Sequence, residues 1–165
     1  MPTRDFVVRD LKFEREGIIN VKEFYSLLKK WVMDHNYDFT EKEYIDSLKD
    51  ETEFVKNTKI KWVNERKVDD YIKFFIEVTI KFKNFKEVKD KKDRHTYKGT
   101  VNVEIEAYLE KDYEEVWEKN FMLHFMREIY DKTVDSNKFN KYKKELNEEV
   151  YDLINDIKAF LKLEE

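Results

Sequence analysis

The chain has 165 residues, of which 41% are hydrophobic and 42% are charged, with a net charge of only −4. This length and apolar content are enough for a core, so we expect residues 1–165 to form a single domain. The mixed charge signs exclude the one-sided charge typical of disordered chains. The chain has no cysteine, which excludes disulfides, thiolate metal sites and a thiol nucleophile.

Targeting signals are also absent from the sequence. No cationic start is followed by an apolar run, as a secretory signal peptide would require. No apolar run is long enough to span a bilayer. We therefore expect a cytoplasmic protein without a membrane span.

The first part of the chain predicts a strand followed by a helix. Residues 5–15 alternate as a strand does, and Gly17 is expected to break that strand. Asn20 is a good N-cap, and Glu23 three residues later completes a capping box. The helix that follows is expected to end near His35 and Asn36. Its apolar stripe consists of Val21, Phe24, Leu27, Leu28 and Trp31.

The next two segments differ in clarity. Residues 37–50 are ambiguous, and a strand over about 39–45 is the favoured interpretation. A clearer strand covers residues 54–64. We place the following turn at residues 65–70. That turn would align Trp62 with Ile72 and Ile60 with Phe74, which puts apolar partners on one face.

The clearest pattern in the chain lies in residues 71–84, where apolar and polar side chains alternate over the whole segment. Residues 97–110 repeat this alternation. Both patterns predict strands with one face in the core and one toward water. The expected buried positions of these two strands include Ile76, Val78, Val103 and Ile105.

The rest of the chain predicts helices. Residues 116–134 are apolar over a broad arc, and Asp135, Ser136 and Asn137 interrupt that pattern. The final helix is expected over residues 138–163. The predicted order is β-α-(β)-β-β-β-α-α, an α+β fold in which helices cover one face of an antiparallel meander sheet. This order resembles the helix-grip arrangement, in which a curved sheet wraps a long C-terminal helix.

Three segments, DFVVRDLKFE, NERKVDDYIKF and IKAFL, resemble a family of small archaeal proteins usually labelled hypothetical. The similarity extends over most of the chain. It implies an archaeal, intracellular origin. It brings no chemistry, so no functional residue is carried over from it.

Catalytic and metal motifs are missing. The glycines stand alone, no serine has a G-x-S-x-G setting, and the three histidines are far apart. His124, Glu128 and Asp131 share one predicted helix edge. Asp34, His35 and Asp38 form a looser group at the end of the first predicted helix. Ordinary surface carboxylates and a helix C-terminal histidine explain both groups more simply. We therefore predict no enzyme, no cofactor and no bound zinc or iron.

Charge is distributed unevenly along the chain. Residues 81–98 hold eight Lys or Arg and three acids, whereas residues 104–118 and 145–165 are acidic. The basic segment is a solvated hairpin tip, a contact with a protein, or a nucleic-acid site in which Phe85 and Tyr97 stack on bases. A pI of about 5.6 makes nucleic acid the least favoured partner. The basic residues proposed for contact are Lys86, Lys89, Lys91, Lys92, Arg94 and Lys98.

The favoured functional hypothesis is a non-catalytic assembly module. The apolar stripe of the final helix is expected to exceed what the sheet covers and to join copies, with acidic and basic surfaces setting their orientation. The partner is then a second copy or another protein. The alternative is a helix-grip protein with a small hydrophobic ligand between the sheet and the C-terminal helix. The stripe consists of Tyr142, Leu146, Val150, Leu153, Ile157 and Phe160.

Overall fold

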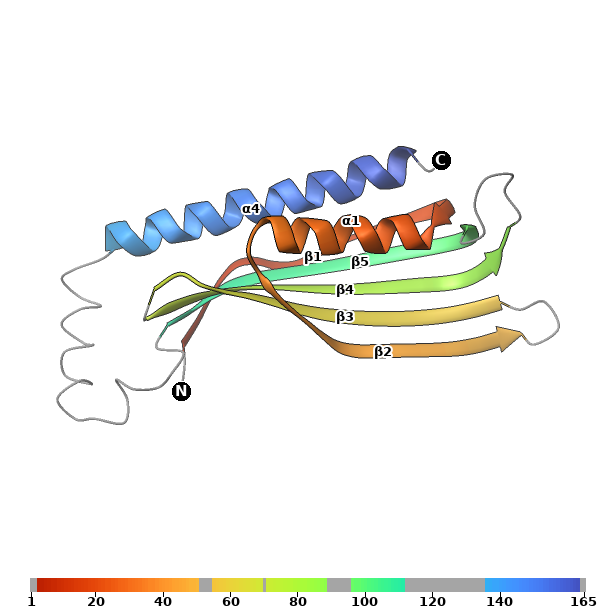
Figure 1. The fold of residues 1–165 in the computed structure, drawn as a ribbon, viewed down its shortest axis with the longest axis horizontal. Helices are drawn as coiled ribbons and strands as arrows, with labels where there is room; N and C mark the ends of the chain where they lie inside the picture. The colour runs from red at the N-terminus through yellow and green to blue at the C-terminus, as the bar shows by residue number, and fades with distance from the viewer. Residues whose placement is uncertain (1–2, 51–54, 70, 89–95, 112–135, 164–165) are drawn as a thin grey trace.

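The computed structural model describes residues 3–50, 55–69, 71–88, 96–111 and 136–163 (Figure 1). Its five strands form one antiparallel sheet in the order β1-β5-β4-β3-β2. The predicted α+β class, antiparallel sheet and long C-terminal helix are confirmed. The elements in chain order are β1 (Thr3–Asn20), α1 (Val21–Asp34), β2 (Asp38–Asp50), β3 (Val55–Lys67), β4 (Ile72–Glu87), β5 (Thr96–Lys111) and α4 (Ser136–Leu163).

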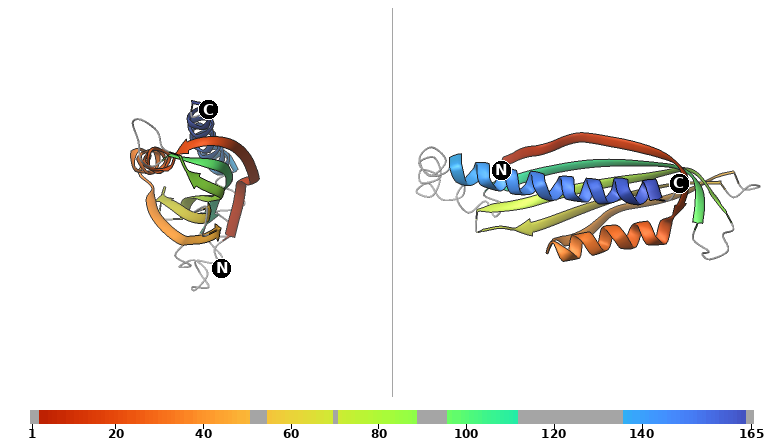
Figure 2. Two further views of the ribbon diagram at one scale, coloured as in Figure 1. Left: turned by 90° about the vertical axis from the view of Figure 1, so that its right-hand side faces the viewer. Right: turned by 90° about the horizontal axis from the view of Figure 1, so that it is seen from above.

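Helices α1 and α4 lie on the same face of the sheet, which we call the inner face (Figure 1). Seen from its end, the sheet curves around them (Figure 2). Alternate residues of β4 and β5 point to this face and form the core. The expected core residues are confirmed, because Ile76, Val78, Val103 and Ile105 are all at most 2% exposed.

Helix α4 packs its apolar stripe into this core. Four stripe residues, Leu146, Val150, Leu153 and Ile157, are at most 1% exposed, and Tyr142 and Phe160 pack against the core. The expectation that this stripe exceeds what the sheet covers is therefore wrong. The reason is length: 28 helical residues span about 42 Å, whereas the 16 residues of β4 or β5 span about 53 Å.

Strand β1 does not break at Gly17, contrary to the prediction. It continues to Asn20 with a regular register in which Gly17 lies opposite Gly99. The long partner β5 supplies backbone hydrogen-bond groups along this whole stretch, and such pairing outweighs the weak strand preference of glycine. The predicted N-cap is confirmed, since Asn20 Oδ1 accepts a hydrogen bond from the Glu23 backbone N–H at 3.1 Å.

The register between β3 and β4 also differs from the prediction. Trp62 lies opposite Val78 and Ile60 lies opposite Ile80. The turn is centred later than expected because Asp69 organises it, accepting hydrogen bonds from the backbone N–H groups of Tyr71 and Ile72 at 2.8 and 2.7 Å. The shift is an even number of residues, so the predicted faces survive.

The remaining boundaries fall close to the predictions. Helix α1 ends at Asp34 with His35 as its C-cap. Strand β2 is longer than the predicted 39–45, and α4 includes Ser136 and Asn137, which were expected to interrupt the helical pattern. The predicted helix over 116–134, with His124, Glu128 and Asp131, lies outside the described residues.

A bulge bends β4 near its C-terminal end. Lys83 lies opposite Thr100 and Lys86 opposite Lys98, so β4 has one extra residue between these pairs. Asn84 adopts a left-handed backbone there, with φ of 56°. The bulge packs closely on Gly99, where an added Cβ would lie 2.3 Å from a ring carbon of Phe85 and 2.8 Å from the Lys83 carbonyl oxygen. Only glycine fits at this point.

Candidate functional site

A groove opens on the inner face between α1 and the sheet, at the end of the sheet where β1 leads into α1. We call it the aromatic groove, and its volume is about 500 Å³, within the range typical of small-molecule sites. Every strand except β1 contributes to it. Its lining residues are Val21, Lys22, Tyr25, Ser26, Lys29, Tyr44, Asp46, Lys56, Thr58, Ile60, Phe82, Phe85 and Tyr97.

Helix α1 supplies one wall. Lys22, Tyr25, Ser26 and Lys29 follow spacings of three, four and seven, which place them on one helix face. This face lies beside the buried stripe rather than within it. The apolar stripe of α1 gives no sign of this face, because the stripe marks only core positions. The same periodicity, applied to the polar and aromatic residues of α1, is the signal that finds this wall.

Aromatic rings form the floor. Phe85 lies 4.7 Å from Phe82 and stacks on Tyr97 at 6.0 Å, measured between ring centroids. Tyr25 meets the buried Trp62 edge to face at 4.9 Å. These contacts hold the rings in place before any ligand arrives. They also correct an expectation, because Phe85 is only 4% exposed and supports the other rings from below, so it offers no open face for stacking on nucleic-acid bases. The rings of Tyr25 and Tyr97, which also line the groove, are partly exposed.

The groove carries a positive balance of charge. Lys22, Lys29 and Lys56 line it, and Asp46 is the one carboxylate among its described lining residues. Asp46 is already engaged, with Lys56 Nζ at 3.7 Å and with the Thr58 hydroxyl, which donates to it at 2.8 Å. Lys22 and Lys29 form no ion pair with the described residues, so their ammonium groups are available to an anion.

Burial raises the pKa of the Tyr25 hydroxyl, and the nearby Glu41 and Tyr44 raise it further. This phenol therefore stays neutral at physiological pH and can donate a hydrogen bond. Histidine and a second carboxylate are missing from the described lining, so the groove lacks an evident acid–base pair. Its residues are suited to holding a molecule rather than to transforming it.

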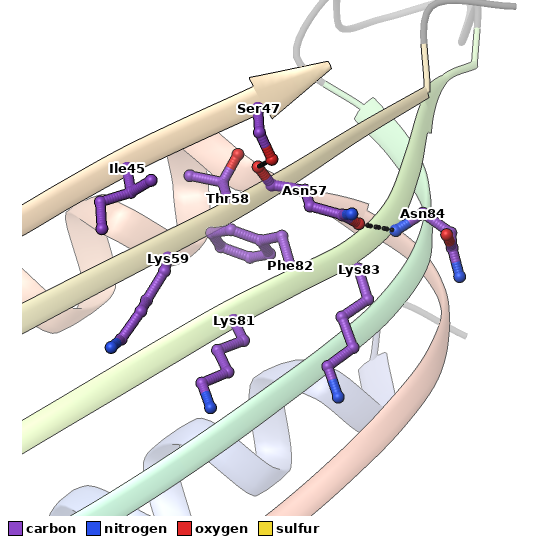
Figure 3. A pocket seen from close by; sticks show the side chains of 9 residues that line it. All are labelled: Ile45, Ser47, Asn57, Thr58, Lys59, Lys81, Phe82, Lys83 and Asn84. Atoms are coloured by element: carbon purple, nitrogen blue, oxygen red, sulfur yellow. Dashed lines mark hydrogen bonds between the residues drawn. The ribbon is translucent and has the colours of Figure 1, made fainter. Parts of the chain in front are cut away.

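The outer face of the sheet carries a separate group of lysines at the same end, which we call the lysine patch. It consists of Lys59, Lys81, Lys83, Lys86 and Lys98, where Lys86 lies opposite Lys98 in the register. Figure 3 shows Lys59, Lys81 and Lys83 beside one another around a shallow hollow of about 350 Å³. Lys59 contacts Glu43 at 3.1 Å. Of the basic hairpin residues predicted for contact, Lys89, Lys91, Lys92 and Arg94 lie outside the described residues.

Acidic side chains meet near the middle of the outer face. Asp10, Glu104 and Glu106 each place a carboxylate oxygen within 4.8 Å of the others. Asp10 reaches this position from a bulge in β1, where its φ is 55°. Burial raises the pKa of Glu106, as do a hydrogen bond with Asp10 and the charges of Asp10, Glu77 and Glu104. Carboxylate oxygens are of the type that binds Mg²⁺ or Ca²⁺. The closeness of these acids is also sufficient to account for the raised pKa of Glu106.

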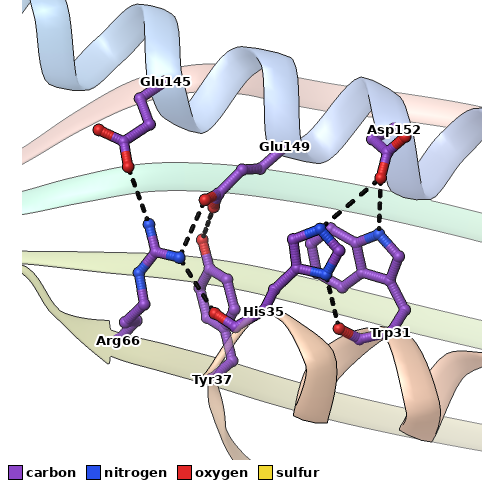
Figure 4. Close-up of polar contacts among 7 residues, drawn as sticks. All are labelled: Trp31, His35, Tyr37, Arg66, Glu145, Glu149 and Asp152. Atoms are coloured by element: carbon purple, nitrogen blue, oxygen red, sulfur yellow. Dashed lines mark hydrogen bonds and ion pairs between the residues drawn. The ribbon is translucent and has the colours of Figure 1, made fainter.

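A third polar group, which we call the helix clasp, ties α4 to α1 and β3 (Figure 4). The Arg66 guanidinium contacts Glu149 at 2.9 Å and Glu145 at 3.3 Å, and donates to the His35 carbonyl oxygen at 3.0 Å. Tyr37 donates its hydroxyl hydrogen to Glu149, and Trp31 donates its indole N–H to Asp152 at 3.3 Å. Burial and the bond to Glu149 raise the pKa of Tyr37. These acids of α4 are thus already paired within the chain.

Neither of the described helices is long and apolar enough to cross a bilayer. Comparison with protein-family models, with curated proteins and with solved structures found no match to this chain. The resemblance to small archaeal proteins therefore stays a prediction.

Proposed function

We propose that this protein binds a small amphipathic anion in the aromatic groove and does not transform it. The observation that carries the proposal is the pairing of fixed aromatic rings with two lysines, Lys22 and Lys29, that have no ion-pair partner among the described residues. Rings favour a flat or aliphatic body, and the ammonium groups favour a carboxylate, sulfonate or phosphate head.

This proposal modifies the ligand hypothesis drawn from the sequence. A cavity was expected between the sheet and the C-terminal helix, but the residues of α4 that face the sheet are packed into the core. The aromatic groove lies under α1 instead. The curved sheet and long final helix resemble a helix-grip arrangement, which supports ligand binding only as an analogy of fold. We place the protein in the cytoplasm of an archaeal cell.

A titration with a fluorescent anion tests the proposal. Anilinonaphthalene sulfonate, followed by displacement with naphthoate or with the neutral naphthamide, separates the contribution of charge from that of the apolar body. We expect naphthoate to displace the probe better than naphthamide. Replacing both Lys22 and Lys29 with Gln should weaken naphthoate binding between about twofold and thirtyfold, the range for two exposed charge pairs, and should leave naphthamide unchanged.

The matched control is Lys30→Gln, which removes an equally exposed lysine of α1 outside the lining of the groove. Equal binding of naphthoate and naphthamide, or equal losses in the control and the double variant, would contradict an anion site. Native mass spectrometry of protein purified from its own host then identifies the natural ligand by its retained mass.

A second candidate function is assembly through charged surfaces, and the lysine patch favours it. Lys81 and Lys83 form no ion pair with the described residues, so an acidic surface of a second copy or of another protein can meet them. The apolar stripe of α4 no longer contributes to this hypothesis, because the chain buries it internally. Nucleic acid is less favoured, because Phe85, one of the two rings expected to stack on bases, is only 4% exposed.

A further inference from the structure

Strand β2 lies at one edge of the sheet, and the described part of the chain gives it a single partner, β3. An edge strand presents unpaired backbone N–H and C=O groups that can pair with another strand. Two large apolar side chains adjoin each other on this edge, Tyr44 at 59% exposed and Ile45 at 54%. An unpaired backbone together with exposed apolar groups is the combination from which sheets extend.

Charges on an edge strand often prevent such pairing, but here they are neutralised from the neighbouring strand. Glu43 contacts Lys59 Nζ at 3.1 Å, and Asp46 contacts Lys56 Nζ at 3.7 Å. Two bulges interrupt β2, one between Glu41 and Glu43 and one between Leu48 and Asp50. The residues between them, 43–48, keep a regular register and form the straight part of the edge.

The sequence of this straight part selects one way for two copies of β2 to pair. In a symmetric antiparallel pair, a two-fold axis passes at one residue, which lies opposite itself. An axis at Glu43 or at Asp46 would place like charges directly opposite each other, which is unfavourable. An axis at Tyr44 would place Glu43 against the apolar Ile45 of the other copy, and an axis at Ser47 would place Asp46 against the apolar Leu48. An axis at Leu48 would place Asp46 against Asp50, which are like charges. An axis at Ile45 avoids like charges and leaves no carboxylate opposite an aliphatic side chain, because Asp46 then faces Tyr44, whose hydroxyl is a donor that a carboxylate accepts.

We propose that this protein forms a two-fold dimer in which β2 pairs with β2 of a second copy about Ile45. Ile45 then lies opposite Ile45 of the second copy on the outer face. On the inner face Tyr44 lies opposite Asp46, and on the outer face Glu43 lies opposite Ser47. The two five-stranded sheets become one continuous sheet.

This arrangement also brings the two aromatic grooves together. Tyr44 and Asp46 line the groove from β2 and lie at the proposed junction. Because the axis runs perpendicular to the sheet, both grooves open on the same side. The dimer does not depend on the ligand proposal, since Ile45 points to the outer face and does not line the aromatic groove.

The mass of the full chain in solution gives the first test. We expect light scattering to report twice the 20.5-kDa chain mass. Ile45→Lys should return the mass to that of one chain, because it places two like charges opposite each other at the axis. Met33→Lys adds the same charge at a residue that is 65% exposed on α1 and should leave the dimer intact. Circular dichroism confirms that both variants fold.

Cross-linking gives the second test and reports the register, because the chain has no native cysteine. In the proposed dimer the Cα atoms of the two copies of residue 45 lie about 4.5–5.5 Å apart, within reach of a disulfide. Under mild oxidation, Ile45→Cys should form a covalent dimer at least about tenfold faster than Met33→Cys. Glu43→Cys, which faces Ser47, should be no faster than Met33→Cys.

Several outcomes would overturn the proposal. A mass of 20.5 kDa at all protein concentrations excludes the dimer. Equal cross-linking rates for Ile45→Cys and Met33→Cys exclude this surface, and preferential cross-linking of Tyr44→Cys excludes the register. The probe titration, repeated on Ile45→Lys, tests the ligand proposal independently of the dimer. If the monomeric variant still binds the probe, the aromatic groove binds its ligand without the second copy.

Discussion

Ile76 shows what the alternation of β4 means for stability. Its side chain is fully buried on the inner face, while the neighbouring Glu77 lies on the outer face. Ile76→Ala should lower the free energy of unfolding by about 2–5 kcal/mol, because it leaves a cavity in the core. Urea denaturation measures this change. Glu77→Ala is the matched control and should stay within about 0.5 kcal/mol of the wild type; a reversed order would mean that the two faces are exchanged.

Glu106 should make stability depend on pH. Its pKa is raised in the folded chain, so the folded state binds its proton more tightly than the unfolded state does. Stability contributed by that proton is complete below the unfolded pKa and is lost as the pH rises through the folded pKa. At neutral pH, Glu106→Gln should therefore stabilise the protein by about 0.2–1 kcal/mol, the range for cross-strand pairs. The gain should vanish near pH 4, below about the unfolded pKa.

Thermal unfolding of the wild type and of Glu106→Gln at several pH values checks this prediction. Lys12→Gln is a useful comparison, because Lys12 contacts Glu104 at 3.9 Å. Removing this positive charge should increase the repulsion among Asp10, Glu104 and Glu106 and lower the stability of the protein at neutral pH. A gain for Glu106→Gln that is independent of pH would assign the effect to packing rather than to charge.

Helix α4 is joined to α1 and β3 by the polar contacts of the helix clasp as well as by its buried apolar stripe. Arg66→Ala removes the guanidinium that joins Glu145 and Glu149 to β3. We expect a loss of about 1–3 kcal/mol, less than for a fully buried ion pair because Glu145 remains partly exposed to water. Hydrogen exchange should show faster opening of α4. Lys144→Ala, at an exposed position of the same helix, should change neither quantity.

The elements also show how far the sequence alone reaches. Alternation in β4 and β5 was sufficient to predict their faces, because one face is buried and the other is wet. The Gly17 break and the β3–β4 register were wrong, since both depend on tertiary pairing and on the side chain of Asp69 rather than on local preference. The aromatic groove as a whole could not be predicted, because Tyr25 and Tyr97 line one groove only when α1 folds back over the sheet.

At the scale of the whole molecule, salt distinguishes the two kinds of self-association. Contacts through the lysine patch should weaken as salt rises, since exposed charges are screened within about 10 Å at about 0.1 M ionic strength. Pairing of β2 relies on backbone hydrogen bonds and apolar contact. The mass of a dimer formed in this way should therefore not change as the salt concentration rises. We expect light scattering to give a dimer at both low and high salt. Dissociation at high salt would favour the charged surfaces instead.

The bulge at Asn84 has a consequence for variation in chain length. The extra residue lies opposite Gly99 between two regular pairs, so deleting Asn84 would leave Phe85 facing inward and Lys86 facing outward, as they do now. What the deletion removes is the bend that the bulge gives to β4, visible where that strand turns at its end (Figure 1). A protein one residue shorter would then keep every lining side chain of the aromatic groove and change only its shape. A difference in ligand selectivity between the shortened chain and the wild type would then come from the curvature of β4, because the lining side chains are the same in both.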